Sequence, residues 1–227
     1  MTRMIASESD MQRLLGFAMA AMAVAFGPTQ AADSTTPLDI LAFGDSLVQG
    51  YGLGEGKTFP GQLEAALRAA GHDARVTNAG SSGDTSETGA ARLDWVMQDS
   101  TDAVIVVLGA NDALRGIDPT VTRHNLNAVM ATLADAGMPV LLAGMKAPRN
   151  MGESYVERFD AIYPELAKRY DAVFYPFYLK GVAQRSALNQ PDGIHPNAKG
   201  VKVIVQNMLP KVEDLIARAK AAADSGS

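Results

Sequence analysis

The sequence predicts an α/β fold in which a parallel sheet carries helices on both faces. Short apolar runs alternate with amphipathic stretches of helical periodicity from about residue 38 onward, and this alternation is typical of βαβ units. The apolar run at residues 103–108 contains four consecutive β-branched residues, which indicates a strand buried on both faces. No linker, repeat or low-complexity segment interrupts residues 38–222, so we expect residues 33–227 to form a single domain.

Five strands and five main helices are expected along this domain. The strands cover residues 39–43, 74–78, 103–108, 140–143 and 172–175, and the helices 59–70, 86–97, 120–136, 155–169 and 198–223. Gly71 and Gly137 end two of the helices, because glycine readily adopts the left-handed conformation found just past a helix C-terminus. Pro210 marks the expected place of any break in the last helix. Trp95 is expected to pack in the core.

The composition excludes several classes of function. Of the 227 residues, 47% are hydrophobic and 20% charged, which is ordinary for a globular protein. The formal net charge is −5 with no basic block, so a nucleic-acid partner is not expected. There is no cysteine, which excludes disulfides, a thiolate nucleophile, a cysteine-based zinc site and a lipid anchor on cysteine. No cofactor or metal is expected.

Residues 1–32 are expected to be a signal peptide that is removed on export. Arg13 precedes an uncharged run over residues 14–26, which is too short to span a bilayer as a stable helix, and small residues follow it. Acidic residues within the first ten fit a signal peptide poorly, so translation is expected to start at Met11. The alternative is an anchor that stays attached, but cleavage is favoured, which gives a periplasmic or secreted protein with no integral membrane domain.

Polar turns that contain glycine follow three of the predicted strands, and a fourth precedes the last helix. They cover residues 44–47, 78–85, 109–112 and 192–197. The carboxyl ends of parallel strands lie at one edge of the sheet, where ligands bind in such folds. We therefore expect the four segments to converge on one cleft and to carry the chemistry.

Ser46 and His195, from the first and last of these segments, suit a nucleophile and its base. A serine hydroxyl attacks an ester well only when a base takes its proton, and histidine is the usual base near neutral pH. Asp192 lies three residues before His195, so its carboxylate can reach Nδ1 and leave Nε2 free for the serine. The other histidines, His72 and His124, lie in a charged turn and inside a predicted helix, which favours His195 as the base.

Donors for an oxyanion are expected from the same edge of the sheet. The backbone N–H groups of Ser46 and Gly83 and the side-chain amide of Asn111 fit this need. Glycine at position 83 lets the backbone approach a substrate closely. Asp45 and Asp112 are instead expected to accept backbone N–H groups and to shape their turns.

In this order, the four segments resemble those of the SGNH (GDSL) hydrolase superfamily. The resemblance is strongest to its bacterial branch of thioesterase I, lysophospholipase and arylesterase, and it extends from Asp39 to the final helix. It implies a three-layer α/β/α, flavodoxin-like fold with a five-stranded parallel sheet. Phe43 is a departure, because an aliphatic residue is usual directly before Gly-Asp-Ser.

The resemblance also implies roles for the residues singled out above. Ser46 would be the nucleophile, with Asp192 and His195 completing the triad. The oxyanion hole would consist of Ser46, Gly83 and Asn111. The implied activity is hydrolysis of a small-molecule ester, thioester or lysophospholipid through an acyl-enzyme on Ser46, and the alternative within the superfamily is deacetylation of a polysaccharide.

Three other classes fit the sequence less well. The nucleophile turn of an α/β-hydrolase needs Gly-x-Ser-x-Gly, and Val48 occupies the last of these positions. A metal-dependent hydrolase built on Asp192 and His195 lacks a further cluster of ligands at suitable spacing. A non-catalytic binding protein with this fold would not need every catalytic position filled.

The segment after the fourth strand is expected to contact the acyl chain of the substrate. It mixes apolar side chains with Gly152 and lies at the edge of the sheet that carries the motifs. The residues expected to contact substrate are Met145, Pro148, Met151 and Tyr155. A similar loop in the thioesterase I branch adjusts to acyl length, and the alternative is a plain surface loop.

Overall fold

The computed structural model of the protein describes residues 37–226, all of which belong to one compact unit. The predicted signal peptide, residues 1–32, lies outside the described residues. The described residues form one sheet of five parallel strands in the order β2-β1-β3-β4-β5. The strands are β1 (Leu38–Gly44), β2 (Ala74–Gly80), β3 (Ala103–Val107), β4 (Val140–Ala143) and β5 (Val173–Tyr175). The predicted α/β fold with a five-stranded parallel sheet is confirmed.

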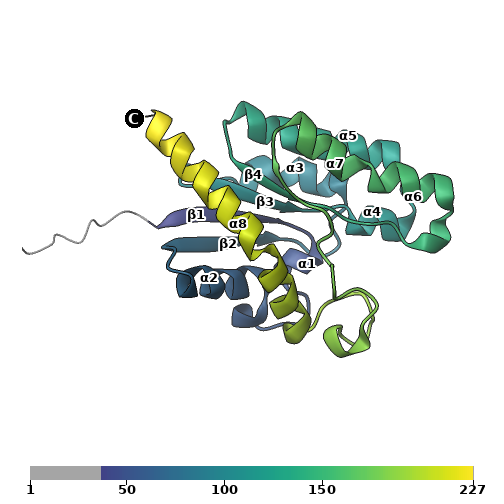
Figure 1. Cartoon of the computed structure of the whole chain (residues 1–227). Helices are drawn as coiled ribbons and strands as arrows, with labels where there is room; N and C mark the ends of the chain where they lie inside the picture. Colours follow the sequence, from purple (N-terminus) through teal and green to yellow (C-terminus); the bar gives the residue numbers. More distant parts are fainter. Residues whose placement is uncertain (1–36, 227) are drawn as a thin grey trace, which may run out of the picture. The chain divides into compact units, whose positions relative to one another are not determined.

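Helices cover both faces of this sheet. The α-helices within residues 37–226 are α1 (Ser46–Gln49), α2 (Phe59–Ala69), α3 (Ser86–Val96), α4 (Ala110–Arg115), α5 (Pro119–Asp135), α6 (Glu153–Asp160), α7 (Ile162–Arg169) and α8 (Ala198–Gly226). Short 3₁₀ turns form η1 (Glu55–Lys57), η2 (Arg149–Met151) and η3 (Ser186–Leu188). Figure 1 shows α2 and α8 against one face of the sheet and α3, α5, α6 and α7 against the other. The three layers follow from right-handed crossovers between parallel strands.

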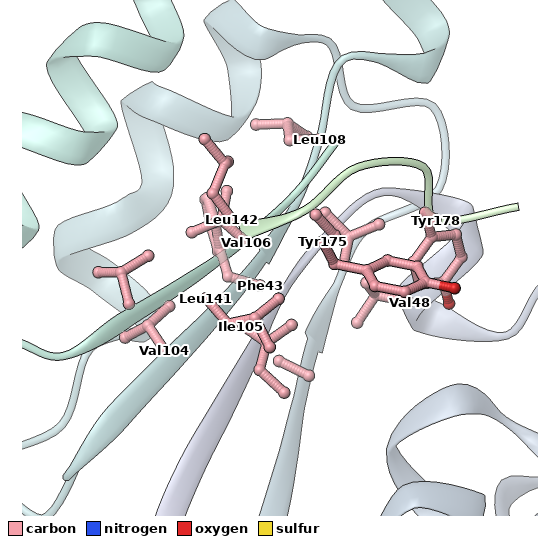
Figure 2. Close-up of a cluster of buried hydrophobic side chains, with 14 of the residues drawn as sticks. Phe43, Val48, Val104, Ile105, Val106, Leu108, Leu141, Leu142, Tyr175 and Tyr178 are labelled. Carbon is pink, nitrogen blue, oxygen red and sulfur yellow. The ribbon is translucent and has the colours of Figure 1, made fainter. Parts of the chain in front are cut away.

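The core lies along both faces of the central strands. Every residue of β3 is buried, as its β-branched run predicts. Figure 2 shows Ile105 and Val106 of β3 in one cluster with Leu141 and Leu142 of β4 and Phe43 of β1. Full burial of such a side chain contributes about 1.5–3 kcal/mol, so the strands that lead to the polar turns are held by dense apolar packing. None of the helices within residues 37–226 is long and apolar enough to span a bilayer.

The helix predicted over residues 155–169 is in fact two helices. The first, α6, begins at Glu153 and ends at Asp160, and α7 begins at Ile162. Pro164 lies in the first turn of α7 and has no N–H to donate to the carbonyl of Asp160, so a single helix does not continue through it. In α8, by contrast, Pro210 lies inside an unbroken helix, at an exposed position where water reaches the freed carbonyl.

Trp95 is exposed, which contradicts the prediction that it packs in the core. Its relative exposure is 90%, whereas Leu93 is buried. The buried face of α3 also carries Gly89, where an added Cβ would meet Leu108. Trp95 follows Leu93 by two positions, which is about 200° around the helix, so the packing of Leu93 and Gly89 directs Trp95 to the surface.

The order of the strands places a crevice directly after β1. The chain passes from β1 to β2 on one side and then crosses to β3 on the other side of β1. Gly44, the last residue of β1, pairs in register with Gly80 of β2 and Val107 of β3. Such a reversal of strand order is where parallel sheets bind ligands, and here it lies directly before Ser46.

Asp45 closes β1 and caps the short helix α1. Its Oδ1 accepts the backbone N–H of Leu47 at 2.9 Å, as predicted, but its Oδ2 is buried without a hydrogen-bond partner among the described residues. Burial, together with the charges of Asp84 and Asp112, raises the pKa of Asp45 from 3.8 to about 7. The carboxyl therefore holds a proton in the folded protein at a pH where it would be ionised in the unfolded chain.

Asp45→Asn should change how stability depends on pH. Because folding raises the pKa of Asp45, the folded state binds more protons than the unfolded state, and the free energy of unfolding falls as pH rises from about 4 to 7. Asparagine does not titrate, so the variant should gain stability over the parent across this range, by on the order of a few kcal/mol. Urea unfolding of both proteins at several pH values measures this difference.

Asp118→Asn is the matched control for Asp45→Asn. Asp118 caps α5 in the same way, with its Oδ1 accepting the N–H of Thr120 at 2.8 Å. It is exposed, and that hydrogen bond lowers its pKa. Asp118→Asn should therefore be less stable than the parent at neutral pH, and this difference should shrink as pH falls, because the parent then loses the stabilisation by its ionised carboxylate. A stability difference for Asp45→Asn that stays constant with pH would contradict the raised pKa.

Candidate active site

Ser46, His195 and Asp192 lie in a hydrogen-bonded row at the carboxyl edge of the sheet. Ser46 Oγ is 2.8 Å from His195 Nε2, and His195 Nδ1 is 2.7 Å from Asp192 Oδ2. A carboxylate only accepts hydrogen bonds, so Nδ1 must donate to Asp192. This leaves the lone pair of Nε2 directed at the hydroxyl of Ser46, the arrangement that activates a serine.

The Asp192 carboxylate is held by the backbone of its own turn. Its Oδ1 accepts the N–H groups of Ile194 and His195, each at 3.0 Å. Gly193 has φ of +76°, a conformation that favours glycine and folds the turn back on itself. The His195 backbone N–H, and then the His195 ring, lower the pKa of Asp192 to about 2. Asp192 is therefore ionised at neutral pH.

Gln190 ties the histidine loop to the loop that follows α1. Its backbone N–H donates to the carbonyl of His195 at 2.7 Å. Its side-chain Nε2 donates to the carbonyls of Tyr51 at 2.7 Å and Pro196 at 3.1 Å. The Tyr51 ring in turn packs on the His195 ring, with centroids 4.6 Å apart. These contacts restrict the imidazole from one side and fix the distance to Ser46.

Gly83 and Asn111 line the same cavity as Ser46 and His195. Gly83 has φ of +86°, and a Cβ at this position would find its nearest neighbour, Arg115 Nη2, at 3.7 Å. Asn111 Nδ2 donates to the carbonyl of Asp84 at 3.0 Å. A side-chain amide has two N–H groups, so the second is available to a substrate oxygen. The structure thus brings together the residues predicted as triad and oxyanion donors.

Asp112 anchors the turn that carries Asn111. Its Oδ2 accepts the backbone N–H of Ser86 at 2.8 Å, and its Oδ1 accepts the hydroxyl of Thr122 at 3.1 Å. The Ser86 hydroxyl also donates to Oδ1, and all three side chains are buried. A buried carboxylate is tolerated when it is satisfied by hydrogen bonds, and this one fixes α4 against α3 and α5.

The cavity beside Ser46 has a volume of about 620 Å³ and a wall that is largely apolar. Part of this wall comes from the segments that follow β4 and β5, including Met145, Ala147, Pro148, Phe177, Leu179 and Ala183. Such a wall binds hydrocarbon by removing apolar surface from water.

Two of the four residues predicted to contact the acyl chain line this cavity. Met145 and Pro148 do so, whereas Met151 and Tyr155 lie outside its lining. The Tyr155 hydroxyl donates to the carbonyl of Ile117 at 2.9 Å. Met151 lies against Gly116. The chain leaves the cavity after Arg149, the first residue of η2, and then begins α6.

Sequence reasoning missed the part of the wall that follows β5. Phe177, Leu179 and Ala183 carry no motif and no titratable group. The available signal was positional, because this segment leaves the same edge of the sheet as the four polar turns. Its backbone is held to the residue directly after β4, since the Tyr178 N–H donates to the carbonyl of Gly144 at 2.8 Å.

The comparisons with known proteins agree with this geometry. The sequence model of the GDSL-like Lipase/Acylhydrolase family matches residues 42–203. Esterase TesA of Pseudomonas aeruginosa is 35% identical over 78% of this chain and 89% of its own length. The Escherichia coli K12 protein named thioesterase 1/protease 1/lysophospholipase L1 is 36% identical over 78% of this chain and 84% of its own length.

A solved structure extends the agreement to the fold. The crystal structure of AlinE4, described as an SGNH-hydrolase family esterase, is 45% identical, with a TM-score of 0.68 over 79% of this chain and 97% of that one. The family match includes Ser46, Gly83, Asn111, Asp192 and His195 within its bounds. The predicted resemblance is confirmed, and the chain belongs to the GDSL-like lipase/acylhydrolase family.

Proposed function

We propose that the protein hydrolyses carboxylic esters and thioesters of apolar acyl chains through an acyl-enzyme on Ser46. The observation that carries this proposal is the hydrogen bond between Ser46 Oγ and His195 Nε2, 2.8 Å long, at the wall of an apolar cavity. A nucleophile, its base and the group that orients the base are all within hydrogen-bonding distance of one another.

In the first half of the reaction, Ser46 Oγ attacks the acyl carbonyl carbon while His195 Nε2 takes its proton. The carbonyl oxygen becomes an oxyanion, which accepts hydrogen bonds from the N–H groups of Ser46 and Gly83 and from the amide of Asn111. His195 then gives its proton to the departing alcohol or thiol, and the acyl group remains on Ser46. Asp192 stays ionised throughout, because its pKa is lowered to about 2, and stabilises the imidazolium.

In the second half, water attacks the acyl-enzyme. His195 Nε2 takes the proton of the water, the same donors stabilise the second oxyanion, and the proton passes back to Ser46 as the acid leaves. The turn of Asp192 keeps its carboxylate on Nδ1 through both halves, so Nε2 faces the reacting atoms each time.

The apolar wall favours acyl chains over polysaccharide as the substrate. Residues such as Met145 and Phe177 offer hydrocarbon contact, whereas sugar hydroxyls need polar partners. The relatives are named for esterase, thioesterase and lysophospholipase activity, which also supports esters and thioesters. These observations give no support to the deacetylase alternative.

Export completes the proposed function, because it determines which esters the enzyme meets. The basic residue, apolar run and small residues within 1–32 support a cleaved signal peptide. Expression of the full chain in a Gram-negative host, followed by fractionation and N-terminal sequencing, should place a shortened protein in the periplasm or the medium. A full-length protein in the cytoplasm would oppose this part of the proposal.

Ser46→Ala and His195→Ala should each lower kcat for p-nitrophenyl butyrate by about 10³-fold or more, because the nucleophile or its base is lost. Circular dichroism should show folded protein in both cases. A phosphonate ester should add its mass to the parent enzyme and to Ser82→Ala, a second serine that lines the cavity. It should not label Ser46→Ala, and a Ser46→Ala enzyme with more than about a tenth of the parent activity would refute the assignment.

Met145→Ala should reduce the preference for long acyl chains. Met145 is almost fully buried and lines the cavity, and each CH₂ removed from contact is worth about 0.8 kcal/mol. The kcat/KM for octanoate esters should therefore fall by about ten-fold, with acetate esters much less affected. Met151→Ala is the control, since Met151 lies outside the lining. Equal losses on both esters would remove the Met145 side chain from acyl recognition.

A further inference from the structure

Arg92, on α3, makes two hydrogen bonds to the strand-end segments that carry the proposed chemistry. Its Nε donates to Asp84 Oδ2 at 2.5 Å, and its Nη2 donates to the carbonyl of Gly44 at 2.7 Å. The Arg92 side chain is 22% exposed and that of Asp84 12%. Because the pair is largely buried, its geometry is far more restricted than that of a surface ion pair.

The ring of Phe43 packs against the guanidinium group of Arg92. The Cζ atom of Arg92 lies 4.6 Å from the centroid of the Phe43 ring, and Phe43 is fully buried. A cation over an aromatic face is attracted by the electron density of the ring. The aromatic ring at position 43 thus has a partner in Arg92.

Asp84 connects Arg92 to Gly83 and Asn111, the two oxyanion donors other than Ser46. It directly follows Gly83 in the chain, and its carbonyl accepts Asn111 Nδ2 at 3.0 Å. Its second carboxylate oxygen accepts the hydroxyl of Thr88 at 3.0 Å, so the carboxylate is fixed on two sides. A displacement of Asp84 would therefore move the Gly83 N–H and release the Asn111 amide together.

Gly44 connects Arg92 to the nucleophile. Its carbonyl accepts Arg92 Nη2 and also the N–H of Ser81 at 3.0 Å. Gly44 lies two residues before Ser46, and Ser81 lies two residues before Gly83. One planar guanidinium group thus bridges the turn that carries the nucleophile and the loop that carries the oxyanion donor Gly83.

We propose that Arg92 is a positioning residue, which sets the oxyanion donors Gly83 and Asn111 at their working distance from Ser46. The proposal rests on the proposed function, since it assumes an oxyanion at this place. Arginine suits the task because its rigid fork donates in two fixed directions, whereas lysine is a point charge on a flexible stem. The competing explanation is a structural ion pair that stabilises the fold without affecting the donors.

The test is a double-mutant cycle between Arg92→Met and Asn111→Ala, with kcat and KM measured for p-nitrophenyl butyrate. Arg92→Met alone should lower kcat by about 100-fold, as small misplacements of catalytic groups do, and change KM by less than about three-fold. In the Asn111→Ala background, the same substitution should cost less than about ten-fold, because one of the groups it positions is already gone. An equal loss in both backgrounds, or a loss confined to KM, would overturn the proposal.

Arg68→Met is the matched control, because Arg68 also pairs with a carboxylate, Glu64 at 3.0 Å, but from α2. It should leave kcat unchanged. If Arg92→Met does not fold, the cycle is run with Arg92→Lys, which should still lose at least about ten-fold in kcat since it lacks the fork. Full activity of Arg92→Lys would refute the proposal.

The cycle also separates the two proposals. If Asn111→Ala leaves kcat unchanged, the oxyanion assignment fails, and the role of Arg92 fails with it. If Asn111→Ala lowers kcat and Arg92→Met adds its full loss, only the role of Arg92 fails.

Discussion

Ser46 Oγ and His195 Nε2 lie 2.8 Å apart, although 149 positions separate them in the chain. Nothing local holds them together, so the bond depends on the sheet. Ser46 leaves β1 at the point where the strand order reverses, and His195 belongs to the last loop before α8. That loop is fixed by a bridge between Asn189 and Pro196 and by the hydrogen bonds of Gln190. The close packing of the apolar core thus fixes the relative positions of the strand ends tightly enough for this hydrogen bond to form.

Three carboxyl groups lie close to the nucleophile, and the negative charge of each is either stabilised by a partner or reduced by protonation. Asp84 is paired with Arg92. Asp112 is satisfied by hydroxyl and N–H donors. Asp45 accepts the Leu47 N–H at one oxygen only, its other oxygen is buried without a hydrogen-bond partner among the described residues, and burial raises its pKa to about 7. A buried charge without a partner is costly, and a group in that position takes up a proton instead. At neutral pH the turn before Ser46 therefore carries less negative charge than its sequence suggests, which favours an oxyanion nearby.

The features of this molecule that depend on residues close together in the chain could be predicted from the sequence. Glycine-containing turns after buried strands gave Ser46, Gly83 and Asn111, and the spacing of Asp192 and His195 was enough to place a carboxylate on Nδ1. Features that depend on packing between elements were not predictable in this way. Trp95 is exposed because Leu93 and Gly89 take the buried face of α3. The wall residues after β5 carry no motif, so only their place at the sheet edge could have indicated them.

The catalytic groups and much of the apolar wall of the cavity belong to different segments of the chain. The groups that do the chemistry lie on turns whose backbone is fixed by hydrogen bonds and by residues such as Asp112 and Gln190. Much of the apolar wall of the cavity, including Met145 and Phe177, comes from other segments, which follow β4 and β5. A change in those segments alters the apolar area offered to a substrate, at about 25 cal/mol per Å², without moving the donors around Ser46. Acyl-chain preference can therefore vary while the hydrolytic chemistry remains the same.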